Sequence, residues 1–127
     1  MSAIKGTVNR VELIGWLGDT PKEKRTSHDV AIANFSVATK RPGMKQEDGS
    51  WLYETEWVDV EAFDHLAETI ISNLKKGSRV RVTGTLRSQT WEDRNGTKHR
   101  TTVVRAEEIM FLDARSSVDE GNMMDAN

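Results

Sequence analysis

The chain of 127 residues contains no cysteine, only two prolines and few aromatic residues, which make up 6% of the sequence. Without cysteine there can be no disulfide framework and no thiolate metal site, and this composition is compatible with a reducing compartment. No apolar run approaches the length needed to cross a bilayer, and no secretory leader is evident. We therefore expect one soluble, cytoplasmic domain, because the length suits a single modest core.

Patterns typical of catalysis or metal binding are also missing. His28, His65 and His99 are scattered without the spacing of metal ligands. The sequence contains no nucleophile elbow, P-loop or HExxH motif. We expect no catalytic residues, no metal, no cofactor and no enzymatic activity, which leaves binding as the favoured class of function.

Charge is nearly balanced overall but unevenly placed. The net charge is -2 and the isoelectric point is near 5.9. Residues 75 to 105 nevertheless carry nine basic residues against two acidic ones, a local balance of +7. Residues 113 to 127 have a balance of -3. A basic stripe within a weakly acidic chain indicates local contact with a polyanion rather than nonspecific attraction by the whole surface.

Residues 55 to 63 alternate with the period of a β-strand. The inward face carries small aliphatic side chains and the outward face carries two large rings with two carboxylates. The inward set is Val58, Val60 and Ala62, and the outward set is Trp57, Asp59, Glu61 and Phe63. Exposed rings gain nothing for the core of their own strand, so they predict a flat partner such as an unpaired base, or another subunit.

Residues 79 to 87 have the same organisation with positive charge added. Val80, Val82 and Leu86 are predicted to point inward, and Arg79, Arg81, Thr83, Thr85 and Arg87 to point outward, with the same parity continuing to Trp91. Arginine is also common on solvated strand edges, but several cations leading to a ring favour phosphate contact. The carboxylates of Asp59 and Glu61 would repel phosphate unless cations such as Arg79 or Arg81 pair with them.

The remaining segments complete a small barrel. Strands are predicted at residues 8 to 17 and 30 to 39. A polar loop is predicted at residues 40 to 53, with Trp51 near its end. An amphipathic helix is predicted at residues 64 to 76, capped by Asp64 and ended at Gly77. Asn95-Gly96 predicts a two-residue hairpin turn, and the return strand reaches residue 112.

Five strands with one short helix between strands 3 and 4 predict an all-β Greek-key barrel of the oligonucleotide-binding type, with a protruding hairpin. We expect residues 1 to 112 to form this domain and residues 113 to 127 to form a short, disordered acidic tail.

Four blocks of sequence, in order, resemble the bacterial single-stranded DNA-binding protein family over roughly residues 6 to 112. They are Asn9-Arg-Val-x-Leu-x-Gly-x-Leu-Gly-x-x-Pro21, Ala33-x-Phe-Ser-Val-Ala-Thr39, Thr55-Glu-Trp57 with Phe63, and Leu74-Lys-Lys-Gly-Ser-x-Val-x-Val-x-Gly-x-Leu-Arg87 followed by Trp91. The resemblance implies an oligonucleotide-binding fold, a homotetramer, a nucleoid-associated location, and roles in DNA replication, repair and recombination.

The resemblance also implies site residues. Trp57, Phe63 and Trp91 match base-stacking positions, while Lys75, Lys76 and Arg87 match basic positions. Together with Arg79 and Arg81 from the parity argument, and with Trp51 in place of a stacking ring that has no match after the second strand, they form the predicted nucleic-acid-binding set.

Three departures from the family pattern bear on partners. Trp16 follows Gly15 where the family commonly has Asn, and is predicted in the core or at a subunit interface. His65 stands where a Lys is common. The chain ends in Asn122-Met-Met-Asp-Ala-Asn127, without the hydrophobic tip that docks replication and repair proteins, so we do not expect recruitment through such a tip.

Two other functions remain open from the sequence. The same fold could bind single-stranded RNA or serve as a primosome accessory, because nothing in the sequence reads the 2'-hydroxyl. The exposed aromatics could instead lie in contacts of a protein-interaction module.

Overall fold

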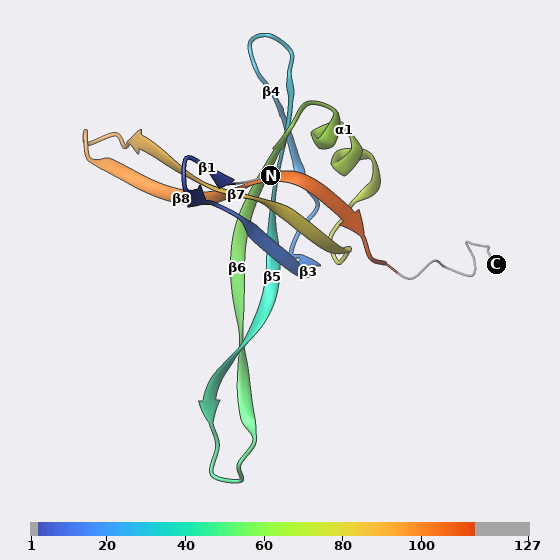
Figure 1. Cartoon of the computed structure of the whole chain (residues 1–127), viewed down its shortest axis with the longest axis vertical. Coiled ribbons are helices and arrows are strands. Elements are labelled where there is room, and N and C mark those ends of the chain that lie inside the picture. Colours follow the sequence, from blue (N-terminus) through green and yellow to red (C-terminus); the bar gives the residue numbers. More distant parts are fainter. Residues whose placement is uncertain (1–2, 114–127) are drawn as a thin grey trace, which may run out of the picture.

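The computed structural model describes residues 3 to 113. Figure 1 shows a central barrel from which two long hairpins project, with one helix beside it. The elements are β1 (Ala3–Ile4), β2 (Thr7–Val8), β3 (Val11–Leu17), β4 (Lys22–Arg25), β5 (Ala31–Lys45), β6 (Trp51–Phe63), α1 (Asp64–Asn73), β7 (Arg79–Glu92) and β8 (Lys98–Phe111). The predicted tail lies outside the described residues, apart from Asp113.

Five strands close into a ring. β3 pairs with β7, β7 with β8, β8 with β6, β6 with β5, and β5 again with β3. All these pairings are antiparallel except that of β6 with β8. The predicted fold class, a five-stranded oligonucleotide-binding barrel, is confirmed. At Gly15, where β3 passes from β7 to β5, a Cβ atom would collide with the Ala38 carbonyl, so the closure needs glycine there.

The core is built from small and branched aliphatic side chains on the inward parity of each strand. The first half of β5 alternates strictly between buried and partly exposed positions, and Ile70 of α1 is fully buried beneath it. The buried residues of the core include Leu17, Ala33, Val37, Val60, Ala62, Val80, Val82 and Val104. Because these inward positions are filled, the outward positions of β5 and β6 are left for function.

Helix α1 is shorter than predicted, ending at Asn73 instead of near residue 76. Phe63 occupies the N-cap position and no side chain caps the helix, so the predicted cap by Asp64 is wrong. The backbone N–H of Gly77 donates to the Leu17 carbonyl at 2.9 Å. Leu74 already has an extended backbone, with φ -107° and ψ 150°, so the last predicted turn of the helix does not form.

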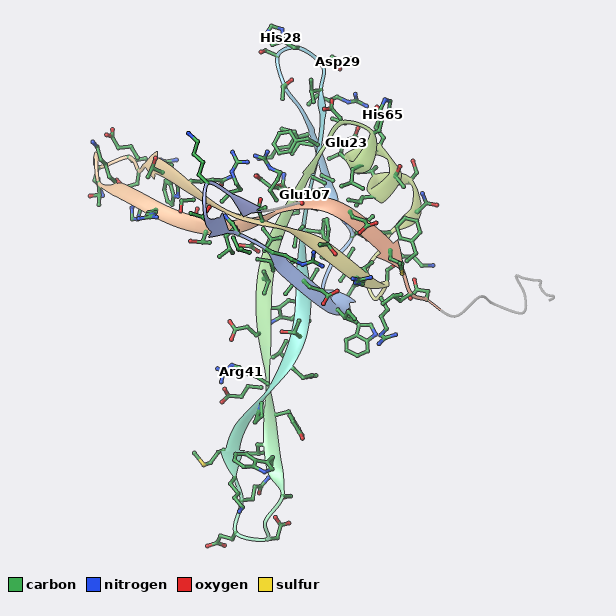
Figure 2. The ribbon with its side chains drawn as sticks, in the orientation of Figure 1. Glu23, His28, Asp29, Arg41, His65 and Glu107 are labelled. Atoms are coloured by element: carbon green, nitrogen blue, oxygen red, sulfur yellow. The ribbon has the colours of Figure 1, made fainter. Side chains whose placement is uncertain are left out.

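The predicted polar loop at residues 40 to 53 is wrong for most of its length. β5 continues to Lys45 and β6 begins at Trp51, so that residues 39 to 56 form an antiparallel hairpin, here called the β5–β6 arm. Arg41 stabilises it by contacting Glu54 at 2.8 Å and Glu56 at 3.0 Å (Figure 2). Backbone pairing along the arm therefore outweighs the turn-forming residues within it.

The β7–β8 arm, residues 85 to 105, is the protruding hairpin that the sequence predicts, but its turn differs. The connection spans residues 93 to 97 rather than two residues. The Gly96 N–H donates to the Asp93 carbonyl at 3.1 Å and the Asp93 N–H donates to the Thr97 carbonyl at 3.0 Å. Gly96 has φ 78°, a conformation that glycine adopts without strain.

One inward prediction in β7 fails. Leu86 is 48% exposed. The register between β7 and β8 shifts between Thr83 and Gly84, where the strands leave the barrel and become the arm. Beyond that point the inward parity faces solvent, because the arm has no core to cover.

No helix within residues 3 to 113 is long and apolar enough to span a membrane. In the same part of the chain, no group of three or more His, Cys, Asp or Glu residues gathers as a candidate metal site.

Candidate nucleic-acid interface

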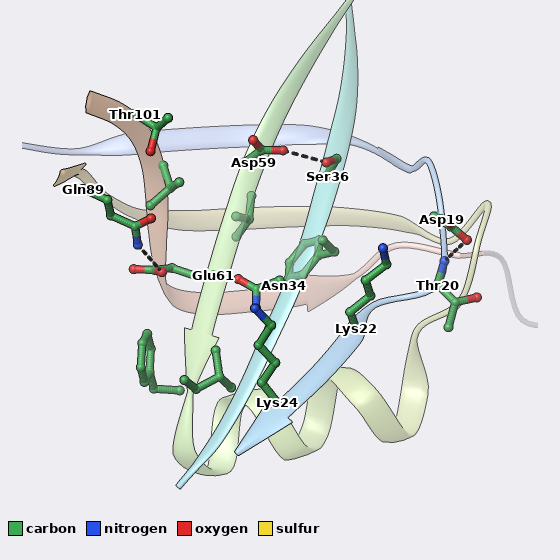
Figure 3. A pocket seen from close by; sticks show the side chains of 15 residues that line it. Asp19, Thr20, Lys22, Lys24, Asn34, Ser36, Asp59, Glu61, Gln89 and Thr101 are labelled. Atoms are coloured by element: carbon green, nitrogen blue, oxygen red, sulfur yellow. Dashed lines mark hydrogen bonds between the residues drawn. The ribbon is translucent and has the colours of Figure 1, made fainter. Parts of the chain in front are cut away.

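A groove of about 720 Å³ lies over the outer face of β5 and β6, between β4 and the β7–β8 arm (Figure 3). Its side chains are mostly polar. Lys22, Lys24, Asn34, Asp59, Phe63 and Gln89 are among the residues that line it. This is the face that oligonucleotide-binding barrels use for their ligands.

Strand register brings distant residues into one row across the groove. Lys22 of β4 is opposite Asn34 of β5, Asn34 is opposite Glu61 of β6, and Glu61 is opposite Arg105 of β8. The row therefore has a cation at each end, Lys22 and Arg105, and the Glu61 carboxylate lies between Asn34 and Arg105.

Glu61 is the largest departure from the predicted outward face of β6, since it is only 5% exposed. Its Oε2 accepts a hydrogen bond from Arg105 Nε at 2.7 Å, and its Oε1 accepts one from Gln89 Nε2 at 2.8 Å. A buried carboxylate is tolerated only when paired and hydrogen-bonded in this way. The predicted repulsion of phosphate by Glu61 is thus removed, but by Arg105 rather than by Arg79 or Arg81.

Arg105 also supports Phe63. The guanidinium carbon lies 4.1 Å from the centroid of the Phe63 ring. A cation at this distance over a ring is held by cation–π attraction, which contributes about 1 kcal/mol. One side of Phe63 is therefore occupied by protein, and the ring is fixed in orientation at the groove.

Trp57 is 55% exposed at the groove end of the β5–β6 arm. Its six-membered ring lies so close to Gly18 that a Cβ atom there would collide with ring carbons. Gly18 thus allows the indole to lie against the backbone that follows β3. The absence of a side chain at Gly18 therefore supports the position of Trp57.

Trp91 is 49% exposed on the β7–β8 arm and is stacked on His99, with ring centroids 4.4 Å apart and planes inclined by 19°. His99 Nε2 is hydrogen-bonded to Asp93 Oδ2 at 2.8 Å. The bond from His99 lowers the pKa of Asp93, and the bond from the Thr97 backbone lowers it further. The Trp91 ring is therefore backed by a fixed imidazole.

The other predicted basic residues lie at different distances from the groove. Lys75 and Lys76 are exposed after α1, and the Lys76 backbone N–H donates to Thr20 Oγ1, on the groove rim, at 3.3 Å. Arg87 is exposed on the β7–β8 arm, opposite Val103, which lines the groove. These three cations therefore border the groove without lining it.

Arg79 and Arg81 lie on another part of the barrel wall, the β3–β7 face, which we define by the outward residues Glu12, Ile14, Trp16, Arg79 and Arg81. Arg79 lies 5.7 Å over the Trp16 ring, and Arg81 Nε donates to Glu12 at 2.6 Å. Trp16 is 46% exposed and so is not a core residue in this chain. Both arginines are engaged away from the groove lining.

Trp51 is the first residue of β6, within the β5–β6 arm, and is 48% exposed. It shares the outward parity of Trp57 but lies six residues earlier in β6, toward the tip of the β5–β6 arm. Of the predicted set, Phe63 alone is among the groove-lining residues.

Sequence reasoning missed the roles of Lys22, Lys24 and Gln89, which line the groove, and of Arg105, which pairs with the lining residue Glu61. Lys22 and Lys24 lie in the run Lys22-Glu23-Lys24-Arg25, which forms β4 but has no apolar residue to alternate with its charges, so the run gave no strand signal. Arg105 was counted in the basic stripe without a role, and Gln89 shares the outward parity of Trp91. The pairing of Gln89 and Arg105 with Glu61 has no local signal, because it joins residues from three strands.

Comparison with known families decides the identity. Residues 8 to 112 match the model of the single-strand binding protein family. The chain belongs to this family.

Relatives of this chain include bacterial proteins. The chain is 35% identical over 115 residues to a single-stranded DNA-binding protein of Caldanaerobacter subterraneus subsp. tengcongensis, and the match covers 91% of this chain and 75% of that protein. It is 37% identical over 106 residues to single-stranded DNA-binding protein 1 of Xylella fastidiosa, covering 84% of this chain and 78% of that protein.

A solved structure agrees with the family assignment. The Plasmodium falciparum SSB complex with ssDNA superposes with a TM-score of 0.76 at 26% identity, covering 87% of this chain and all of that one. The predicted membership in the single-stranded DNA-binding family is confirmed by these matches.

Proposed function

We propose that this chain binds single-stranded DNA without strong sequence dependence and protects it during replication, recombination and repair. The observation that carries the proposal is the groove on β5 and β6, with Phe63 at one end, lysines on its rim and an exposed tryptophan on each neighbouring arm. The proposed role is binding, with no catalytic step.

The rings would act as stacking platforms. Trp57, Phe63 and Trp91 are each supported from one side, by Gly18, Arg105 and His99 respectively. A fixed ring loses little conformational entropy when a base stacks on it, and each stacked base contributes about 1 to 3 kcal/mol. We assign a lesser role to Trp51, because it lies farther out on the β5–β6 arm.

Cations without a partner in the protein would contribute most to neutralising phosphate. Among the described residues neither Lys22 nor Lys24 forms an ion pair, and both line the groove. Lys75, Lys76 and Arg87 border it and would extend the path of the strand. Arg79 and Arg81 keep their predicted role but would contribute less, because Trp16 and Glu12 already engage them.

Tryptophan fluorescence tests this function directly. Titration of the protein with a mixed-sequence single-stranded DNA oligonucleotide at low salt should quench the emission, and the matched duplex should quench it much less. A matched RNA oligonucleotide added in competition measures the preference for deoxyribose. An emission unchanged by the single strand at low salt would contradict the proposal.

We also propose a homotetramer. The support is an exposed apolar group on and beside the β3–β7 face, where Ile14 is 48%, Trp16 46% and Met110 47% exposed. Apolar side chains gathered on one part of a surface favour contact with another protein surface. Light scattering with and without a long oligonucleotide would measure the assembly, and a monomer in both conditions would contradict it.

The proposed function has a domain and a cellular location. We assign binding to residues 1 to 112, supported by the family match over residues 8 to 112, and treat residues 113 to 127 as an acidic tail. The proposed location is the cytoplasm, in association with the nucleoid. Proteins of replication and repair are proposed as further partners.

A further inference from the structure

The β7–β8 arm is attached to the rest of the chain by side-chain hydrogen bonds at two points of β7. Near the root of the arm, Asn9 Oδ1 accepts from the Leu86 N–H at 2.8 Å, and Asn9 Nδ2 donates to the Leu86 carbonyl at 3.0 Å. Three residues farther out, Gln89 Nε2 donates to Glu61 Oε1 of β6 at 2.8 Å (Figure 3). One attachment would let a hairpin pivot, whereas two attachments fix its direction.

Glu61 joins both strands of this arm to β6. Its Oε1 accepts from Gln89 of β7, and its Oε2 accepts from Arg105 of β8 at 2.7 Å. The Glu61 side chain is buried, and a hydrogen bond to a charged group is strong where water is excluded. Replacing a buried pair of this kind by apolar side chains often costs no stability, which favours a role in fixing one geometry.

The direction of the arm decides where Trp91 lies. Trp91 is not among the groove-lining residues, but Gln89, two residues before it on the same face of β7, does line the groove. The Trp91 ring is stacked on His99, and the His99 ring is hydrogen-bonded to Asp93 at 2.8 Å. The indole is thus held to the arm itself, and its position relative to the groove depends on how the arm is attached.

We propose that the Glu61–Gln89 hydrogen bond positions the β7–β8 arm so that Trp91 and Phe63 stack on bases of the same DNA strand. Phe63 stands two residues after Glu61 with the same outward parity, so this bond joins the two strand faces that carry the rings. When two binding elements are held in a fixed relation, a strand bound by one meets the other at a high effective concentration. Glu61 and Gln89 are then positioning residues, and the inference rests on the proposed function.

Gln89→Ala removes the outer attachment without changing the charge of the groove. Gln89 is exposed, so the variant should keep the fold, which a thermal melt followed by circular dichroism checks. Its affinity for a mixed-sequence single-stranded DNA oligonucleotide should fall about fivefold, a part of the stacking energy of one base. Ser88→Ala is the matched control. Its hydroxyl accepts from Arg100 at 3.0 Å within the arm, so its loss should leave the affinity unchanged.

A double variant shows whether the effect passes through Trp91. In a Trp91→Ala background the ring is absent, so Gln89→Ala should cost less than about twofold in affinity. A general loosening of the structure would instead cost the same factor in both backgrounds. Anisotropy titrations of all four chains at one salt concentration provide this comparison.

The position of the arm can also be measured without DNA. Because the chain has no cysteine, Ser72→Cys on α1 and Arg94→Cys at the arm tip create two exposed sites for nitroxide labels. Dilution with unlabelled chain restricts the signal to label pairs within one chain. The distance distribution from pulsed electron paramagnetic resonance should become clearly broader with Gln89→Ala and keep its width with Ser88→Ala.

The outcomes separate this inference from the proposed function. Failure of the unchanged chain to bind single-stranded DNA would contradict the function itself. Tight binding that Gln89→Ala leaves unaltered, or a loss that persists in full in the Trp91→Ala background, would overturn the inference. A distance distribution that keeps its width in Gln89→Ala would overturn it as well.

Discussion

The groove face and the β3–β7 face each combine an exposed tryptophan with arginine, yet their charges are directed differently. On the β3–β7 face, Arg79 covers Trp16 and Arg81 is paired with Glu12. On the groove face, Arg105 pairs with Glu61 and lies over Phe63, while Lys22 and Lys24 line the groove without an ion pair among the described residues. We therefore propose that an exposed ring beside an arginine does not by itself make a binding site, and that a concave surface with unpaired cations is also needed.

The largest expected difference between the faces is in stability. Arg105→Ala should lower the free energy of unfolding by about 3 kcal/mol, because it leaves the buried Glu61 carboxylate unpaired. Arg81→Ala should cost less than about 1 kcal/mol, because its partner Glu12 is solvent-exposed. Urea denaturation followed by circular dichroism measures both values. Equal losses would mean that the Glu61 pair is no more important than a surface ion pair.

Single-ring truncations separate the faces by affinity. Trp57→Ala should weaken binding of single-stranded DNA about tenfold to a hundredfold, the loss of one stacked base. Trp16→Ala should change it by less than about twofold, because Trp16 lies on the β3–β7 face, where Arg79 lies over its ring, and not on β6 with Phe63. Anisotropy titrations at one salt concentration provide the comparison. If the Trp16 variant lost as much affinity as the Trp57 variant, the assignment of the DNA path to the groove would be wrong.

Charge removal sharpens the comparison through salt dependence. The double variant Lys22→Gln with Lys24→Gln should reduce the slope of log affinity against log salt by about 1.4, the value for two phosphate contacts to a single strand. Arg79→Gln with Arg81→Gln removes the same charge, and a smaller change is expected because both arginines have partners in the protein. A larger change in the arginine variant would reverse the ranking of the two faces.

The smallest effect concerns the tip of the β7–β8 arm. The bond to His99 lowers the pKa of Asp93 in the folded chain. A carboxyl group with a lowered folded-state pKa stabilises the structure above its unfolded pKa, and the contribution is lost as the pH falls through the folded value. The tip should thus stay ordered through the ordinary range of aspartate titration and open only in stronger acid.

Amide chemical shifts report this opening. The Asn95 and Thr97 N–H groups donate to Asp93 Oδ1, so their shifts should move together as the pH falls. In Asp93→Asn the shifts should not follow that titration. Movement of these amides at the pH of an ordinary exposed aspartate would contradict the role given to His99.

The predictable part of the fold came from local alternation and turn signals. Val60, Ala62, Val80 and Val82 are buried as expected, Val58 is partly buried, and the barrel with its hairpin follows the predicted order. The β5–β6 arm was mistaken for a loop, because Pro42 and Gly43 are turn formers and the pairing of Arg41 with two glutamates across the hairpin is not visible in one strand.

The site divides in the same way. Outward parity found Trp57, Phe63 and Trp91 as exposed or partly exposed rings, since a strand assigns its side chains to faces by period alone. The parity could not reveal that Glu61 is buried, that Arg105 lies over Phe63, or that Lys22 and Lys24 line the groove.

By itself, the sequence determined which side chains lie inside the barrel and which lie outside, because β-strand geometry fixes that alternation residue by residue. Only the tertiary structure decided which outward side chains meet. The pairing of β6 with β8 brings Arg105 next to Glu61, 44 residues away in the chain, so that one arginine neutralises a carboxylate that would repel DNA and also lies over the Phe63 ring. The physical reason is that charge pairing depends on distance in space, which a strand's own sequence does not record.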